Sequence, residues 1–163
     1  MIRAALHDGH FSVFSFYQAR KVSIYVYFPV RLVPAPEGGY VVSFPDIPEA
    51  LTQGETRQQS LDTALEALVT AFEFYFEDSQ SVPLPSPEKE GDDFVEVPLS
   101  VASKVLLLNA FLASKISQQE LAKRIGRPKQ EITRLFDLRH ATKIDAVQTA
   151  ARALGKELSL TLS

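Results

Sequence analysis

The sequence contains no cysteine and no tryptophan, and only three histidines: His7, His10 and His140. Without cysteine the chain forms no disulfide, no cysteine-ligated zinc site and no thiolate nucleophile. The histidines do not stand at the spacing of a metal-binding helix or finger. No run approaches the roughly 18 apolar residues of a membrane helix, and the stretch from Phe11 to Tyr17 lacks a signal-peptide core. We therefore expect a cytoplasmic protein that uses no metal ion and no other cofactor.

The rest of the composition is typical of a folded protein. Of 163 residues, 45% are hydrophobic and 23% are charged, which is enough apolar material for one domain or two small ones. Residues 1–98 hold 6 Lys and Arg against 15 Asp and Glu, a net charge of −9, and residues 99–163 hold 11 against 5, a net charge of +6. This asymmetry favours two modules with different partners, the basic one facing a polyanion. The alternative is that the charges only keep both modules in solution.

Alternating apolar residues predict three strands in the acidic half, at Val22–Leu32, Tyr40–Phe44 and Ala50–Gly54. A turn rich in proline and glycine separates the first two strands, which should form a hairpin. Thr56 and Gln59 then stand at the spacing of a capping box, and apolar residues recur every three or four positions. We expect a helix from there to about Glu77, covering the sheet.

The segment 79–93 is rich in proline and acidic residues. Such a segment is neither a helix nor part of a core, and it should transmit little packing between the modules. Phe94–Val97 then has the pattern of a further strand, which Pro98 ends. We expect an N-terminal extension of unknown role at 1–21, an αβ domain at 22–98 that includes segment 79–93, and a helical domain at 99–163.

Four helices and a short strand are predicted in the basic half, at Ser100–Ser114, Gln118–Ile125, Pro128–Leu138, Ile144–Leu154 and Leu158–Leu162. The last helix and the strand carry apolar residues that a small helical core has no room to cover. We expect these two elements to join copies of the chain into an even-numbered homo-oligomer.

The stretch from Ser117 to Phe136 has the pattern of two short helices joined by a tight turn. Ser117 and Glu120 form a second capping box, Gly126 has the backbone freedom that a tight turn needs, and Pro128 suits the first position of the next helix. This pattern is typical of a helix-turn-helix, whose second helix lies in the major groove of DNA. The alternative is an ordinary helical hairpin with a polar surface.

The exposed face of the second helix would hold Lys129, Gln130, Thr133 and Arg134. Gln130 suits an adenine edge, Arg134 a guanine edge and Thr133 a thymine methyl group. Side chains better suited to phosphates are Lys123, Arg124, Arg127 and Arg139. The positive charge of this half of the chain favours DNA binding over the plain hairpin.

Two family resemblances accompany these patterns. Gln118, Ala122, Gly126, Ile132 and Leu135 stand where the Cro/CI-like repressor helix-turn-helix family has its characteristic residues. The segment 38–54, with its Tyr-x-x-x-Phe-Pro-Asp-Ile-Pro turn followed by Thr-Gln-Gly, resembles the HicB antitoxin family. The resemblance spans about Tyr27 to Ser163.

These resemblances imply an α+β protein, with a degraded ribonuclease H-like αβ sheet domain followed by an all-α helix-turn-helix domain. They imply that the protein is not an enzyme, that it binds and inhibits a HicA-type mRNA-cleaving toxin, and that it represses its own operon. On the same ground Gln118 joins the expected DNA contacts.

The acidic half supplies the expected toxin contacts, because a toxin that cleaves RNA must present basic residues to phosphates. The candidates are Tyr40, Phe44, Asp46, Glu49, Glu55, Glu73, Glu77 and Asp78. The alternative is that these residues form an ordinary solvated surface.

Two other functions are weighed against this interpretation. A ribonuclease H-like sheet admits a two-metal nuclease, with Asp46, Glu49, Glu55 and Asp62 as its carboxylates. Acids at turns and helix starts are ordinarily structural, however, which makes this the weaker hypothesis. The second alternative is a stand-alone transcription factor whose N-terminal domain senses a small ligand.

Overall fold

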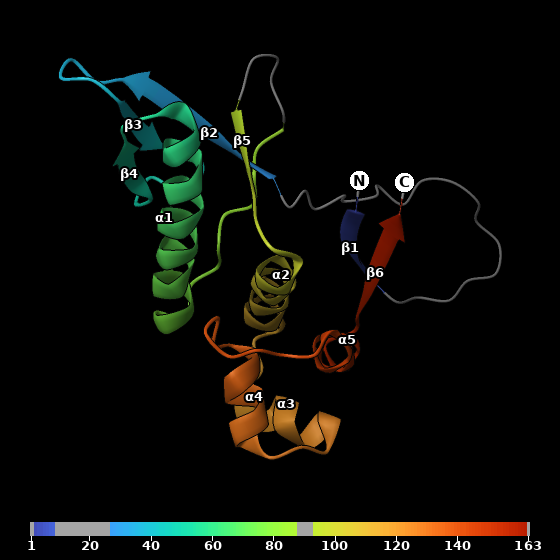
Figure 1. Ribbon diagram of the computed structural model, residues 1–163. Coiled ribbons are helices and arrows are strands. Elements are labelled where there is room, and N and C mark those ends of the chain that lie inside the picture. The colour runs from blue at the N-terminus through green and yellow to red at the C-terminus, as the bar shows by residue number, and fades with distance from the viewer. Residues whose placement is uncertain (1, 9–26, 88–92, 163) are drawn as a thin grey trace.

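The computed structural model describes residues 2–8, 27–87 and 93–162 and has an α+β fold (Figure 1). Four strands form an antiparallel sheet in the order β4-β3-β2-β5. They are β2 (Tyr27–Pro34), β3 (Tyr40–Ser43), β4 (Leu51–Gly54) and β5 (Asp93–Glu96). The long helix α1 (Arg57–Glu77) lies against this sheet. The α+β class is therefore confirmed, and the hairpin of β2 and β3 is where the alternation predicts it.

The described part of the first strand begins at Tyr27, so the expected start at Val22 lies outside the described residues. The strand runs to Pro34, two residues beyond its expected end. Its turn is closed by the Ala35 N–H, which donates to the Gly39 carbonyl at 3.0 Å. Gly39 has a φ of 76°, a conformation that glycine adopts without strain.

The start of α1 fits closely against the sheet. Thr56 is its N-cap, and the Thr56 hydroxyl accepts from the Gln59 N–H at 3.2 Å. The Gln59 side chain accepts in return from the Glu55 N–H at 3.1 Å, one residue earlier than in a regular capping box. A Cβ on Gly54 would lie 2.6 Å from the Ser60 hydroxyl oxygen, and one on Gly39 would lie 2.5 Å from the Gly54 carbonyl oxygen. Only hydrogen atoms fit at these two positions.

The first core lies between the sheet and the inner face of α1. Leu68 and Phe72 of α1 are fully buried there, and the Phe72 ring lies 5.3 Å from that of Phe28 on β2. Two large aromatic rings in tilted contact bury much apolar area and stabilise the approach of helix to sheet. An ion pair from Arg57 to Asp93 joins the first turn of α1 to β5.

Residues 79–87 and 93 of segment 79–93 are described, and the expectation that the segment carries little packing is wrong at 79–87. Val82 is buried in the first core at 1% exposure. Its N–H and carbonyl are both bonded to the Asn109 side chain, at 2.9 and 2.8 Å. Asp46 accepts from the N–H of Ser86 at 2.9 Å and from its hydroxyl at 3.1 Å. The segment therefore contacts both halves of the chain, through Asp46 in the N-terminal half and Asn109 in the C-terminal half.

The C-terminal half contains α2 (Leu99–Ser114), α3 (Gln118–Ile125), α4 (Lys129–Leu135) and α5 (Ile144–Ala153). The first, second and fourth of these agree with their predicted spans to within about a residue. α4 is shorter at both ends than the expected Pro128–Leu138, because Pro128 is its N-cap and Phe136 its C-cap. The residues after Phe136 form a turn that is held by a side chain of α2, described below.

Two hydrophobic cores share α2. Ala102, Val105 and Leu108 belong to the first core, which includes the sheet and α1. Leu107, on the opposite side of the same helix, belongs to the second core with α3, α4 and α5. The domain boundary expected after Pro98 stays a prediction. The helix α2, which follows Pro98, packs in the cores of both halves of the chain.

The strand β6 (Lys156–Leu162) ends the described chain and pairs antiparallel with β1 (Ile2–Asp8), from Ile2 opposite Leu162 to Asp8 opposite Lys156. No strand was expected at 2–8. The expectation that the terminal strand is left uncovered is wrong at Leu158, which is buried in the second core. The two ends of the described chain therefore lie side by side, at the end of this strand pair away from α5 (Figure 1).

Among the described helices, none is by itself long and apolar enough to cross a membrane. The pair α2 and α3 has the length and composition when taken together, but the two helices are bent by 107° where they meet.

Candidate nucleic-acid and partner-binding surfaces

The helix α3 begins and ends at residues that its sequence specifies. The Ser117 hydroxyl accepts from the Glu120 N–H at 3.1 Å, which satisfies one of the unpaired donors at the helix start. Gly126 ends the helix with a φ of 70°, and its N–H donates to the carbonyls of the last turn. The chain then needs only Arg127 and Pro128 before α4 begins.

The pair α3 and α4 is held together by a small apolar core and one polar contact. Leu121 and Ala122 of α3 are buried against Ile132 and Leu135 of α4. Outside this core the Thr133 hydroxyl lies 3.2 Å from the Gln118 Oε1 atom and donates to it or to the Lys129 carbonyl. The Gln118 side chain is therefore engaged with α4.

Burial of Ile132 and Leu135 turns the opposite side of α4 to solvent. Lys129, Gln130, Thr133 and Arg134 are all exposed, as the helical spacing predicts. Because the buried side chains fix the rotation of α4, its exposed face has one orientation. A rigid helix with exposed amide, guanidinium and ammonium groups has the donors that base edges and phosphates accept.

The remaining basic side chains of this surface differ in whether they form ion pairs. Lys123 is exposed, while Arg124 is paired with Glu120 at 3.0 Å and Arg127 with Glu131 at 3.9 Å. Pairs of exposed side chains one helical turn apart are weak and exchange readily for other partners.

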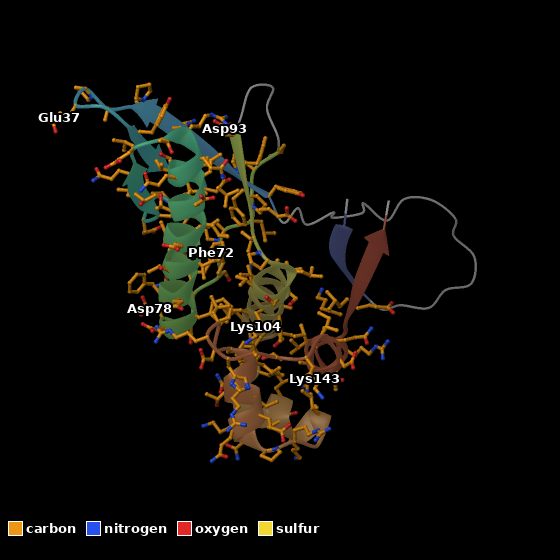
Figure 2. All side chains as sticks on the ribbon, in the orientation of Figure 1. Glu37, Phe72, Asp78, Asp93, Lys104 and Lys143 are labelled. Carbon is orange, nitrogen blue, oxygen red and sulfur yellow. The ribbon has the colours of Figure 1, made fainter. Side chains whose placement is uncertain are left out.

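An open cavity of about 440 Å³ lies between α4 and the start of α5. Its lining includes Arg127, Arg134, His140 and Lys143, together with the carboxylates of Glu131 and Asp145. Lys143 is also the N-cap of α5, and Figure 2 shows it beside that helix, above α3 and α4. The basic surface therefore extends beyond α4 to the start of the next helix.

Lys104 is the only charged side chain that is buried in the part of the chain that the structure describes. It lies between α2 and the end of α4 (Figure 2), and its Nζ donates to the carbonyls of Asp137 at 2.5 Å, His140 at 2.6 Å and Arg134 at 3.4 Å. Burial lowers the pKa of this ammonium group, and the nearby Asp137 carboxylate partly opposes that shift. An ammonium group at the C-terminal end of a helix also interacts favourably with the helix dipole.

Arg139 was expected at DNA phosphates, and the structure places it against α1. Its Nη2 lies 2.8 Å from Glu73 Oε2 and 3.3 Å from Glu77 Oε1. Hydrogen bonding and charge from Glu73 are the main causes that raise the pKa of Arg139. Arg139, which was expected to contact DNA, thus contacts Glu73 and Glu77, which were expected to contact a toxin.

The other expected toxin contacts divide into separate groups. Tyr40 and Glu55 line an open groove of about 750 Å³ beside the β2–β3 turn, near the start of α1. Glu49 accepts a bond from the Tyr75 hydroxyl at 3.2 Å, toward the other end of the helix, where Asp78 is the C-cap. Twenty-one residues of helix extend about 30 Å, so the two groups do not form one site.

Phe44 is a correction to the expected toxin surface. Its side chain is 2% exposed and belongs to the first core with Ile47 and Val42. A partner could reach it only by opening the sheet, so we remove it from the candidate surface. Phe44 directly follows β3 and continues its alternation, two residues after buried Val42, and this pattern is the signal that assigns it to the core.

The carboxylates considered for a nuclease are not gathered. Asp46 binds Ser86, Glu49 binds Tyr75, and Asp62 accepts from the Gln58 side chain at 3.0 Å. Within residues 2–8, 27–87 and 93–162, no group of three or more His, Cys, Asp or Glu residues could hold a metal ion. The geometry offers no support for a two-metal mechanism.

Two features of this region are not among the sequence-based expectations. Lys104 interrupts an apolar run from Val101 to Leu108, and a lone cation in such a run is a signal for a buried, paired charge. The pairing of Arg139 with Glu73 and Glu77 has no local signal, because the partners are more than 60 positions apart.

Comparison with known proteins now defines the class. Residues 27–106 match a family model described as the HicB_like antitoxin of a bacterial toxin-antitoxin system. Antitoxin HicB of Escherichia coli strain K12 is 73% identical over 135 residues, which are 83% of this chain and 98% of that protein. The chain belongs to the HicB antitoxin family, as the resemblance of segment 38–54 implied, and this family is not one of enzymes.

More distant relatives bear the same name. Antitoxin HicB 1 of Photorhabdus laumondii is 58% identical over 162 residues, 99% of each chain, so it has a counterpart of the N-terminal extension. Antitoxin HicB of Pseudomonas fluorescens is 35% identical over 126 residues, 77% of this chain and 86% of its own length. The family model extends past Pro98 to residue 106, which includes most of the α2 residues that pack in the first core.

Proposed function

We propose that this chain inhibits a HicA-type mRNA-cleaving toxin and represses its own operon by binding operator DNA through α3 and α4. The observation that carries the DNA-binding half is the exposed polar and basic face of α4, held in one orientation by buried Ile132 and Leu135. The toxin-binding half rests on membership of the antitoxin family. Both activities place the protein in the cytoplasm.

In this proposal α3 and α4 are a helix-turn-helix and α4 is the recognition helix. Gln130, Thr133 and Arg134 contact base edges, with Lys129 beside them. Lys123 contacts phosphates, as do Arg124 and Arg127 once their weak surface ion pairs are exchanged, and Gln118 positions Thr133. Lys143 and His140 extend the basic surface along the backbone of the DNA.

The N-terminal domain is proposed to have a degraded ribonuclease H-like fold. The antiparallel succession of β2, β3 and β4 followed by a long helix supports it. Toxin inhibition works by steric occlusion combined with charge complementarity. The available acidic candidates are Asp46, Glu49, Glu55, Glu73, Glu77 and Asp78, with Tyr40 beside the hairpin turn.

We also propose an even-numbered oligomer. One recognition helix contacts few base pairs, so helix-turn-helix proteins generally bind as dimers to two half-sites about one helical turn apart. Ile144 at the start of α5 is 39% exposed, and within the described residues β6 pairs with a single strand, β1. Both features lie in the DNA-binding half, where a second copy would set the spacing of the recognition helices.

The test is to express the chain with a tag and determine what it retains. Copurification with a small basic protein encoded beside it, together with salt-sensitive binding to the upstream DNA of the same operon, is the expected result. A chain that binds this DNA but retains no protein, and responds instead to a small molecule, would be the stand-alone transcription factor. A chain that protects cells from the toxin but does not bind DNA would refute the proposed repression and leave the proposed toxin inhibition standing.

A further inference from the structure

The loop that follows α4 carries Arg139 to the acidic end of α1. The guanidinium group contacts both Glu73 and Glu77, at 2.8 and 3.3 Å, and remains 68% exposed. The same loop directly follows the helix proposed to lie in the major groove. With α4 in the major groove, as proposed, an exposed cation at this position would face the DNA backbone, where a phosphate could accept from it. In this structure the guanidinium group is paired with carboxylates instead.

The loop is held firmly in this place. The Lys104 ammonium donates to the carbonyls of Asp137 and His140, on either side of Arg139. The Arg139 N–H donates to the Asp137 carboxylate at 2.9 Å, and Leu138 packs against the first core. These contacts hold the backbone of Arg139 beside α1, and from there its largely exposed side chain contacts Glu73 and Glu77.

A groove of about 280 Å³ joins the two surfaces at this point. Glu73 and Glu77 of α1 line one side, and Thr133 of α4 and Arg139 line the other. Thr133 is one of the proposed base contacts, so DNA in contact with α4 lies close to the two carboxylates. Phosphates and these carboxylates are both anions, and they compete for the same cation.

We propose that Glu73 and Glu77 hold Arg139 in an autoinhibitory ion pair, which DNA binding must break. The inference rests on the proposed DNA binding and goes beyond it, because it makes operator affinity depend on the N-terminal helix α1. Occupation of Glu73 and Glu77 by another basic group would free Arg139 for DNA. By thermodynamic linkage, DNA binding would equally expose these carboxylates to such a partner.

The test measures binding of the full chain to the upstream DNA of its own operon at low salt. The variants are Glu73→Gln/Glu77→Gln, Arg139→Gln and the triple combination, with Asp62→Asn/Glu66→Gln as the matched control. The control removes two exposed negative charges from the same helix away from the loop. Thermal unfolding of each variant checks that it is folded.

We expect Glu73→Gln/Glu77→Gln to bind DNA about two- to fivefold more tightly than the control variant, since exposed ion pairs change equilibria by about this factor. In the Arg139→Gln background the same two substitutions should add no more than the control does. An equal gain in the control, or an undiminished gain without Arg139, would overturn the inference and assign the effect to overall charge. Failure of the wild-type chain to bind DNA would instead refute the proposed DNA binding itself, and the ion pair would then have no competitor.

Discussion

Asn109 is paired with the backbone of Val82 in both directions. Its Oδ1 accepts from the Val82 N–H at 2.9 Å, and its Nδ2 donates to the Val82 carbonyl at 2.8 Å. The amide side chain of Asn109 thus satisfies the backbone N–H and carbonyl of Val82, which in a sheet would be bonded to a neighbouring strand. This contact joins the proline-rich segment to the helix that the two cores share.

The first prediction concerns this amide. Asn109→Ala leaves a partly buried N–H and carbonyl without partners, and we expect it to lower the free energy of unfolding by about 1–3 kcal/mol. Ser114→Ala removes only a local bond to the Phe111 carbonyl in the same helix and should cost about 0.5 kcal/mol or less. Urea unfolding of both variants measures the difference. Equal small losses would show that water replaces the amide.

The second prediction concerns where the N-terminal domain ends. A fragment of residues 27–115 retains the Val105 and Leu108 side chains that complete the first core, and a fragment of residues 27–98 lacks them. Each large apolar side chain contributes about 1.5–3 kcal/mol when buried. The longer fragment should therefore be more stable by about 3 kcal/mol or more in urea unfolding. Equal stability would support a domain boundary at Pro98 and modules that act alone.

The third prediction separates base readout from phosphate contacts. Gln130→Ala and Arg134→Ala should each weaken binding to operator DNA by about 1–3 kcal/mol and affect random DNA little, because bidentate base contacts supply that discrimination. Lys123→Ala should weaken both DNAs alike and lower the salt dependence by about one ion. If the ratio of operator to random binding stays constant in all three variants, α4 does not lie in the major groove.

The fourth prediction uses the lowered pKa of Lys104. Between that pKa and the ordinary value of 10.5, the unfolded chain binds a proton that the folded chain has released, so the free energy of unfolding gains a contribution that rises with pH. Below this window the contribution is constant. The difference in unfolding free energy between wild type and Lys104→Met should therefore shift in favour of wild type as the pH rises toward 10.5. A difference that is flat with pH would show that the folded state does not perturb the group.

The fifth prediction concerns assembly. The full chain should have the mass of an even-numbered oligomer at micromolar concentration, and Ile144→Lys should reduce that mass, because a charge would replace an exposed apolar contact. Asp145→Lys, at the neighbouring exposed position, serves as the control. A monomeric wild-type chain that still binds its operator would contradict the proposal.

Local signals in the sequence predict much of this fold. The cap at Thr56, the glycine at the end of α3 and the alternation in β3 each act within a few residues, and all three are seen as expected. The spacing of Ile132 and Leu135 likewise predicts which face of α4 is exposed. These features follow from backbone geometry and side-chain periodicity alone.

Other features depend on contacts between distant parts of the chain and have no local signal. The composition of segment 79–93 indicates a linker, yet Val82 is buried because Asn109 satisfies its backbone. The charges of Arg139 and Glu73 indicate two separate binding surfaces, yet the fold brings them together. The pairing of β1 with β6 joins the two ends of the described chain, which no periodicity encodes.

The fit of Gly39 and Gly54 against their neighbours affects how substitution data on this protein should be interpreted. Any side chain at Gly54 would collide with Ser60, and any at Gly39 would collide with the Gly54 carbonyl. Both glycines also line the open groove beside the hairpin turn. A survey of all substitutions scored by cell survival would therefore mark these partly exposed positions as strongly as true contact residues. Affinity measured per folded molecule would separate the two, since a side chain at Gly54 would displace the start of α1 and one at Gly39 would displace β4, without removing a partner contact.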